Sequence, residues 1–166
     1  LMAYNIFDDR IERALPCAAA VEVFHNFTLL HDDIMDNSDV RRGRPSVHRK
    51  WGRNVAILSG DAMMISAYRL LEEVEPEYIQ RIHSIFNSMD LKVCEGQQYD
   101  MDFEGLEHVG TGRSLEMIRL KTAALFSGSM SMGAYYAGAS QEDMEHIYDF
   151  STSLGIAFQI RDDILD

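Results

Sequence analysis

The chain has 166 residues, of which 46% are hydrophobic, so it is long enough to bury one sizeable core. Its net charge of −12 is opposite to what a nucleic-acid-binding surface needs, so we expect no nucleic-acid partner. No uncharged apolar run is long enough for a transmembrane helix, and the two cysteines predict a reduced, cytoplasmic protein rather than a disulfide framework.

Apolar residues recur at helical spacing along the chain, which predicts an all-α fold, a bundle of long packed helices. No linker or repeat divides the sequence, so we expect residues 1–166 to form a single domain. In chain order, the predicted helices cover about residues 12–37, 46–51, 54–73, 76–102, 114–137 and 140–166.

Local signals mark several of these boundaries. Pro16 and Pro76 are typical of the first turn of a helix. Asn54 is a candidate N-cap, and Gly138 is a candidate C-terminal cap. The segment Ser140–Asp143 has the pattern of a capping box and predicts the start of the last helix.

Three carboxylates stand at the end of the first long helix, at Asp32, Asp33 and Asp36. Asp32 and Asp36 are four residues apart and share one helical face, where they repel each other and oppose the helix dipole. A bound Mg²⁺, which takes carboxylate oxygens, would remove both costs. The EF-hand alternative fails, because Asn37 and Gly43 stand where its glycine and its bidentate glutamate are needed.

The same Asp-Asp-x-x-Asp spacing returns at Asp162, Asp163 and Asp166. One such cluster is equally typical of a solvated acidic helix end, whereas two copies favour a metal site. Arg41 and Arg42 follow the first cluster, and guanidinium groups beside metal-binding carboxylates are suited to a diphosphate.

Together these motifs resemble those of the trans-isoprenyl diphosphate synthases. The resemblance runs through most of the chain and implies the isoprenoid synthase fold. The matching segments, in the family's order, are His25–Asp36, Arg41–Pro45, Ser59–Asp61, Gly96–Asp100, Lys121–Thr122 and Phe158–Asp166.

The resemblance implies a magnesium-dependent prenyltransferase of isoprenoid biosynthesis, which condenses isopentenyl diphosphate with dimethylallyl, geranyl or farnesyl diphosphate. Ionisation of the allylic diphosphate is followed by condensation and loss of a proton, which the departing diphosphate takes. Three Mg²⁺ ions, with Mn²⁺ as a substitute, are expected. The residues that would bind these ions, directly or through water, are Asp32, Asp33, Asp36, Asp162, Asp163 and Asp166.

Further roles follow from the same resemblance. Arg41 and Lys121 would hold the allylic diphosphate, and Arg42 and His25 would hold isopentenyl diphosphate. Taken alone, His25 is more typical of an ordinary packed or surface histidine.

The backbone carbonyls of Lys121 and Thr122, with the Gln159 amide, would face the developing carbocation. Gln97 and Asp100, three residues apart on one helical face, would hold in place the residues that contact the substrate, without contacting it themselves.

Product length is expected to depend on Phe24, Phe27 and Thr28, which lie on one side of the first helix before Asp32. An aromatic residue at position 27 with a small residue at position 28 resembles the geranylgeranyl-type enzymes. We therefore predict a C20 product, with C15 as the second choice, although both phenylalanines would also serve as ordinary packing residues.

The resemblance also implies a homodimer, for which Met130, Met132, Tyr135 and Tyr136 are candidate contact residues. The family's GGKxxRP segment and its closing C-terminal helices do not appear in this sequence, so we expect a fragment whose own activity is open.

Two other kinds of protein share some of these sequence features. A class I terpene cyclase is disfavoured because its second metal motif is usually not aspartate-rich. A non-catalytic subunit, or a truncated partner of an active synthase, stays open. Stabilisation by Mg²⁺ and diphosphate would separate it from an enzyme.

Overall fold

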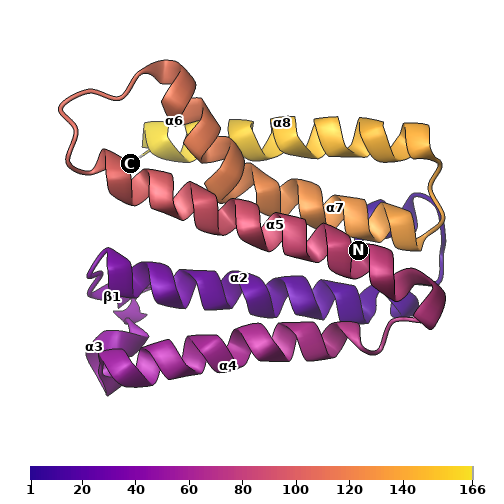
Figure 1. Ribbon diagram of the computed structural model, residues 1–166, viewed down its shortest axis with the longest axis horizontal. Helices are drawn as coiled ribbons and strands as arrows, with labels where there is room; N and C mark the ends of the chain where they lie inside the picture. Colours follow the sequence, from indigo (N-terminus) through magenta and orange to yellow (C-terminus); the bar gives the residue numbers. More distant parts are fainter. Residues whose placement is uncertain (166) are drawn as a thin grey trace. The chain divides into compact units, whose positions relative to one another are not determined.

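The computed structural model describes residues 1–165, and these form two compact units. Unit 1 comprises Leu1–Ala14 and the chain from Pro76 onward, and unit 2 comprises Leu15–Glu75. Long helices dominate both units (Figure 1), which confirms the predicted all-α fold.

Unit 2 is built on two antiparallel helices, α2 (Leu15–Met35) and α4 (Arg53–Leu71), which lie side by side (Figure 1). Small buried residues on α4 (Ala56, Gly60 and Ala67) allow the two helices to approach closely. The connection contains the two-residue strands β1 (Val40–Arg41) and β2 (Arg44–Pro45), followed by the short helix α3 (Val47–Trp51).

The two strands form a minimal hairpin in which Arg41 pairs with Arg44. Its two loop residues, Arg42 and Gly43, both have positive φ angles, of 52° and 73°. This is the backbone that a two-residue hairpin turn requires, and it is uncommon for a residue with a side chain such as arginine. The hairpin, which the sequence did not predict, therefore fixes Arg42 at an exposed tip.

Unit 1 contains α5 (Pro76–Phe103), α7 (Ala124–Tyr136) and α8 (Gln141–Leu165), which alternate in direction (Figure 1). Between α5 and α7 come α6 (Thr111–Ile118) and a π-helical segment, η2 (Arg119–Ala123). The N-terminal helix α1 (Met2–Asn5) and the 3₁₀ turn η1 (Ile11–Ala14) also belong to this unit.

Aromatic packing fixes the N-terminal segment on α7. The ring of Tyr4 meets Tyr136 edge-on with centroids 5.8 Å apart, and the Arg13 guanidinium lies over the Tyr136 ring. Tyr136 is buried in this packing, and Met132 is also buried on α7, so the prediction that these two residues form a surface for a second subunit was wrong.

Most predicted boundaries agree with the structure to within a few residues. The capping box is confirmed, because the Asp143 backbone N–H donates to Ser140 Oγ at 3.1 Å. Gly138 has the left-handed φ of +83° that was expected of a C-terminal cap. Asn54 was wrongly predicted as a cap, because α4 already begins at Arg53. No helix within residues 1–165 is both long and apolar enough to cross a membrane.

Candidate functional site

The first aspartate cluster lies at the C-terminal end of α2, and an ion pair organises it. Asp33 is buried, and its Oδ1 accepts from Arg41 Nε at 2.8 Å and from Arg41 Nη2 at 2.6 Å. Arg41 Nη2 also lies 3.4 Å from Asp32 Oδ2. The hydrogen bonds to Asp33 raise the pKa of the Arg41 guanidinium. Arg41, predicted to hold a diphosphate, is therefore paired with two carboxylates of the motif in this structure.

The carboxylates of this motif face different surroundings. Asp36 is exposed, whereas Asp33 is turned toward Arg41. Within residues 1–165, no three side chains of His, Cys, Asp or Glu converge closely enough to hold a metal ion by themselves. Such an arrangement fits a Mg²⁺ ion that is bound by one or two carboxylates and whose other ligands are water molecules and substrate phosphates. Asp32 and Asp36, one helical turn apart, are carboxylates of the right kind and spacing.

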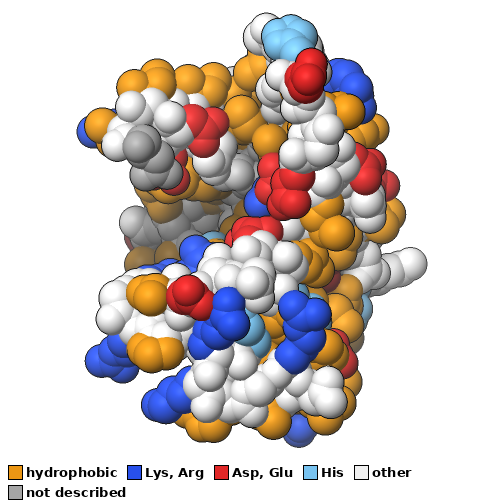
Figure 2. Space-filling model, turned by 90° about the vertical axis from the view of Figure 1, so that its left-hand side faces the viewer, with side chains coloured by type: hydrophobic (Ala, Val, Ile, Leu, Met, Phe, Trp, Pro, Cys, Tyr) orange, Lys and Arg blue, Asp and Glu red, His pale blue; other side chains and the backbone are white. Residues whose placement is uncertain are grey.

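Basic side chains gather on unit 2 around β1, β2 and α3 (Figure 2). Five of them are exposed, namely Arg42, Arg44, Arg49, Lys50 and Arg53. Arg49 is paired with Asp39 at 2.6 Å. The predicted diphosphate residue Arg42 is thus part of a wider positive surface next to the first aspartate cluster within the same unit.

His25 lies two turns before Asp32 on α2 and is half-buried. Burial lowers the pKa of its imidazole, and the positive charges of Arg42 and Arg41 lower it further, against the opposing charge of Glu22. The neutral imidazole is therefore favoured in the folded protein.

The second group of predicted residues lines a small cavity in unit 1, between α5, α6, η2 and α8. Its volume is about 140 Å³, and it is lined by Asp100, Met117, Ile118, Lys121, Thr122, Gln159 and Asp163. Five of these seven residues were predicted from the sequence as site residues.

Hydrogen bonds join the polar residues of this cavity across helices. Lys121 Nζ lies 2.6 Å from Asp100 Oδ2. Thr122 Oγ1 donates to Gln159 Oε1 at 2.9 Å, and Gln159 Nε2 donates to Asp163 Oδ1 at 2.7 Å. The second aspartate motif is in this way linked through Gln159 to the segment that carries Lys121 and Thr122.

Two glycines allow α5 and α8 to pack closely on η2, and neither was predicted from the sequence to have this role. A methyl group at Gly96 of α5 would lie 2.2 Å from the Lys121 backbone nitrogen. One at Gly155 of α8 would lie 2.6 Å from the Ala123 Cα. Both glycines thus let a helix pack directly on the backbone of the π-helical segment η2, a type of helix irregularity that is frequent at functional sites.

The remaining predicted residues are placed as follows. Gln97 lies outside the cavity lining, and its side-chain Nε2 is buried with no hydrogen-bond partner within residues 1–165. Asp162 is exposed on the last turns of α8. Asp166 lies outside the described residues. Phe24 and Phe27 are buried on α2, with ring centroids 5.6 Å apart.

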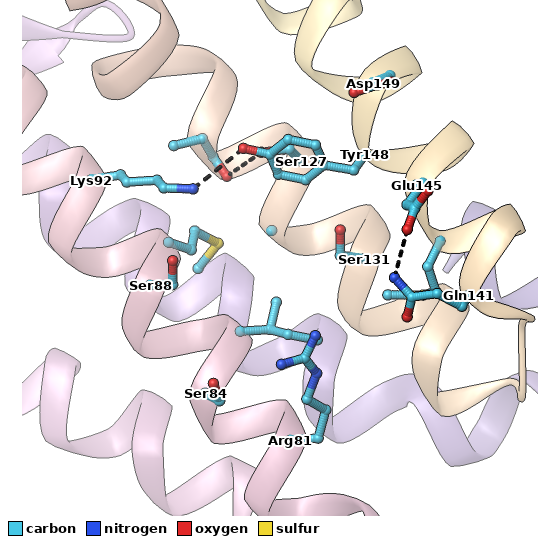
Figure 3. Close-up of a pocket in the computed structure, with 15 residues that line it drawn as sticks. Arg81, Ser84, Ser88, Lys92, Ser127, Ser131, Gln141, Glu145, Tyr148 and Asp149 are labelled. Atoms are coloured by element: carbon cyan, nitrogen blue, oxygen red, sulfur yellow. Dashed lines mark hydrogen bonds between the residues drawn. The ribbon is translucent and has the colours of Figure 1, made fainter.

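A larger cavity, of about 440 Å³, lies elsewhere between α5, α7 and α8 (Figure 3). Lys92 reaches across it to the Tyr148 hydroxyl at 3.3 Å, and Gln141 donates to Glu145 at 2.9 Å. None of the predicted site residues lines it. The smaller cavity is therefore the candidate functional site of unit 1, despite its size.

Comparison with known proteins shows a consistent group of relatives. The polyprenyl synthetase family profile matches residues 1–166. A geranylgeranyl diphosphate synthase of Sulfolobus acidocaldarius is 47% identical over 97% of this chain and 50% of its own length. One of Methanosarcina mazei is 41% identical over 100% of this chain and 52% of its own.

Solved structures agree with these relatives. A crystal structure of a geranylgeranyl pyrophosphate synthase superposes with a TM-score of 0.96 at 48% identity, over 99% of this chain and 50% of that chain. The chain thus spans about half the length of the relatives that it matches.

Proposed function

Because this chain belongs to the polyprenyl synthetase family, we propose that the protein containing it is a prenyltransferase that elongates an allylic diphosphate with isopentenyl diphosphate. In this reaction the allylic C–O bond breaks and diphosphate leaves. The double bond of isopentenyl diphosphate attacks the resulting carbocation, a carbon–carbon bond forms, and a proton is lost to the departing diphosphate.

The observation that carries this proposal is the cluster around the 140 Å³ cavity of unit 1. An ammonium group (Lys121), a hydroxyl (Thr122) and an amide (Gln159) meet there beside Asp163 of the second aspartate motif. A leaving diphosphate needs positive charge, whereas a carbocation needs nearby oxygen dipoles and no water. The cluster supplies both kinds of group on rigid helices.

Divalent metal completes the proposal. Asp32 and Asp36 in unit 2, and Asp162 and Asp163 in unit 1, are the carboxylates that would bind Mg²⁺, directly or through water, with substrate phosphates as its further ligands. When bound, Mg²⁺ supplies Lewis acidity to the leaving diphosphate. Arg42 and the neutral His25 would bind the diphosphate of isopentenyl diphosphate, and release of Arg41 from Asp33 would free its guanidinium for the allylic diphosphate.

For the product we propose C20. Several relatives are named geranylgeranyl diphosphate synthases, and one from Aeropyrum pernix, 40% identical, is named a geranylfarnesyl diphosphate synthase. The aromatic pair Phe24 and Phe27 on α2 is the feature of this chain that would stop elongation by steric overlap.

We also propose that the protein is a homodimer. The exposed apolar residues Val55, Leu58 and Ile65 of α4, which are 50%, 69% and 60% exposed, are better candidates for the contact than the buried Met132 and Tyr136. Light scattering would give the mass of a dimer, and a monomer at micromolar concentration would contradict it.

The direct test of function is incubation of the purified protein with labelled isopentenyl diphosphate, Mg²⁺ and each of dimethylallyl, geranyl and farnesyl diphosphate. We expect a C20 alcohol after dephosphorylation of the product, and none when EDTA is added. A protein that incorporates no label with any of the three, and that Mg²⁺ and diphosphate do not stabilise, would instead be a non-catalytic subunit.

A further inference from the structure

His31, the residue before the first aspartate motif, is enclosed between two helices of unit 2. Its Nε2 lies 3.2 Å from the backbone carbonyl oxygen of Ile57 on α4 and 3.9 Å from Asp61 Oδ1. A carbonyl oxygen can only accept, so this contact is a hydrogen bond in the tautomer that has its N–H at Nε2. The imidazole therefore ties the last turns of α2 to α4.

Gly60 makes the space for this ring. A methyl group on Gly60 would lie 2.3 Å from His31 Nε2 and 2.5 Å from its Cδ2, closer than real atoms approach. Gly60 is itself buried in the contact of α4 with α2. Any larger residue at position 60 must therefore displace the imidazole or separate the helices.

The other side of the imidazole meets Phe27. The two rings are in edge-to-face contact, with centroids 4.7 Å apart and an interplanar angle of 66°. Phe27 in turn contacts Phe24 at 5.6 Å. One row of rings on α2 thus begins at a histidine whose position is set by α4.

We propose that His31 is a positioning residue that fixes the orientation of the Phe27 ring, so that Gly60 and Asp61 of α4 influence product length without touching the substrate. This inference rests on the proposed function, in which Phe27 limits elongation. Loss or displacement of the imidazole removes one wall of the Phe27 site, and the phenyl ring gains the freedom to turn away from the growing chain.

The test is a double-mutant cycle in the purified protein with His31→Ala, Gly60→Ala and the double variant. Each single change is expected to raise the ratio of longer to normal product by about ten-fold, within the range that one hydrophobic contact gives to specificity. In the double variant, Gly60→Ala should add no further change, because the ring that it displaces is absent. Gly112→Ala is the control, since a methyl group there meets nothing within 4 Å.

A second variant separates ring packing from the hydrogen bond. His31→Gln keeps an N–H that can reach Ile57 but has no ring for Phe27, so it should match His31→Ala in product length while melting closer to wild type. A product distribution unchanged in His31→Ala and His31→Gln, or a full additional shift from Gly60→Ala in the double variant, would overturn the proposal.

A readout that does not need turnover keeps this inference distinct from the proposed function. With 4-fluorophenylalanine at position 27, the ¹⁹F resonance should move in His31→Ala and in Gly60→Ala but not in Gly112→Ala. If the wild-type protein elongates no substrate while the resonance moves, the proposed function fails and the coupling of His31 to Phe27 stands. A resonance that stays in place in every variant refutes the coupling itself.

Discussion

Lys121 Nζ lies 2.6 Å from Asp100 Oδ2, which joins the π-helical segment η2 to the helix α5. We expect Lys121→Met to lower kcat by about 100-fold, because the proposed role of its charge is to stabilise the leaving diphosphate. Asp100→Asn should cost less, about ten-fold and mainly in KM for the allylic substrate, since the ammonium group is kept but no longer held in place. Steady-state kinetics on both variants checks this.

Lys92→Met is the matched control for Lys121→Met. Lys92 is also partly buried in unit 1, but it bonds to Tyr148 in the larger cavity. Its replacement should leave kcat within about two-fold of wild type. Equal losses in the Lys92 and Lys121 variants would show that the effect is one of folding.

The ion pair between Asp33 and Arg41 should be important for stability. Asp33→Asn is expected to lower the free energy of unfolding by about 2 kcal/mol, less than for a fully buried pair because the Arg41 side chain is 38% exposed. Asp39→Asn breaks a pair of the same 2.6 Å length with Arg49, but Asp39 is 76% exposed. That change should cost about 0.5 kcal/mol or less. Urea unfolding that ranks the two variants in the opposite order would refute this account.

Gly96 should tolerate no side chain. Gly96→Ala places a methyl group against the Lys121 backbone, so η2 must shift, at a cost of about 1–3 kcal/mol of stability and with loss of activity. Gly112→Ala, at an open helical position, is expected to melt within about 2 °C of wild type. Thermal melting and turnover of the two variants make the comparison. Wild-type activity in Gly96→Ala would mean that the packing of α5 on η2 is not needed.

Because of His25, the free energy of unfolding should fall as the pH falls below 6.5. Its pKa in the folded protein is lowered from the usual 6.5, so below pH 6.5 the unfolded chain binds more protons than the folded one. Its contribution to stability is fully present above pH 6.5 and is lost as the pH falls toward the folded pKa. His25→Gln should therefore lose less stability than wild type between pH 7 and pH 5, as measured by urea unfolding. The exposed His108→Gln should follow wild type, and a His25 variant that also does so would contradict the assignment.

Much of this fold is readable from the sequence because its signals are local. Pro76 begins α5, and Ser140 with Asp143 caps α8, as predicted. Each of these depends only on the backbone within one turn of the residue.

The π-helical turn η2 had no such local signal. Gly96 and Gly155 of two other helices pack directly against its backbone. Only their tertiary contacts distinguish these glycines from ordinary helical ones, so the sequence pattern predicted one continuous helix instead.

The residues of the candidate site could be predicted from the sequence, but some of their contacts could not. The motif resemblance predicted Asp100, Lys121, Thr122, Gln159 and Asp163, which line one cavity in the structure. It did not predict that Arg41 is paired with Asp33, because a side-chain pair between the end of α2 and β1 leaves no periodic pattern in the sequence. Equally, Met132 and Tyr136 look like surface candidates by composition, and only the folded structure shows that both are buried, Tyr136 against the ring of Tyr4.

We propose that both aspartate motifs serve one magnesium-dependent condensation, which incorporation of labelled isopentenyl diphosphate tests most directly. Asp32→Ala and Asp162→Ala should each abolish incorporation, with a loss of at least about 1,000-fold, because a metal ligand is gone and phosphate charge is left uncompensated. Asp149→Ala, an exposed carboxylate on the same helix as Asp162, should retain wild-type activity at saturating Mg²⁺. Near wild-type incorporation by either the Asp32 or the Asp162 variant, or undiminished turnover of wild type in EDTA, would contradict the account.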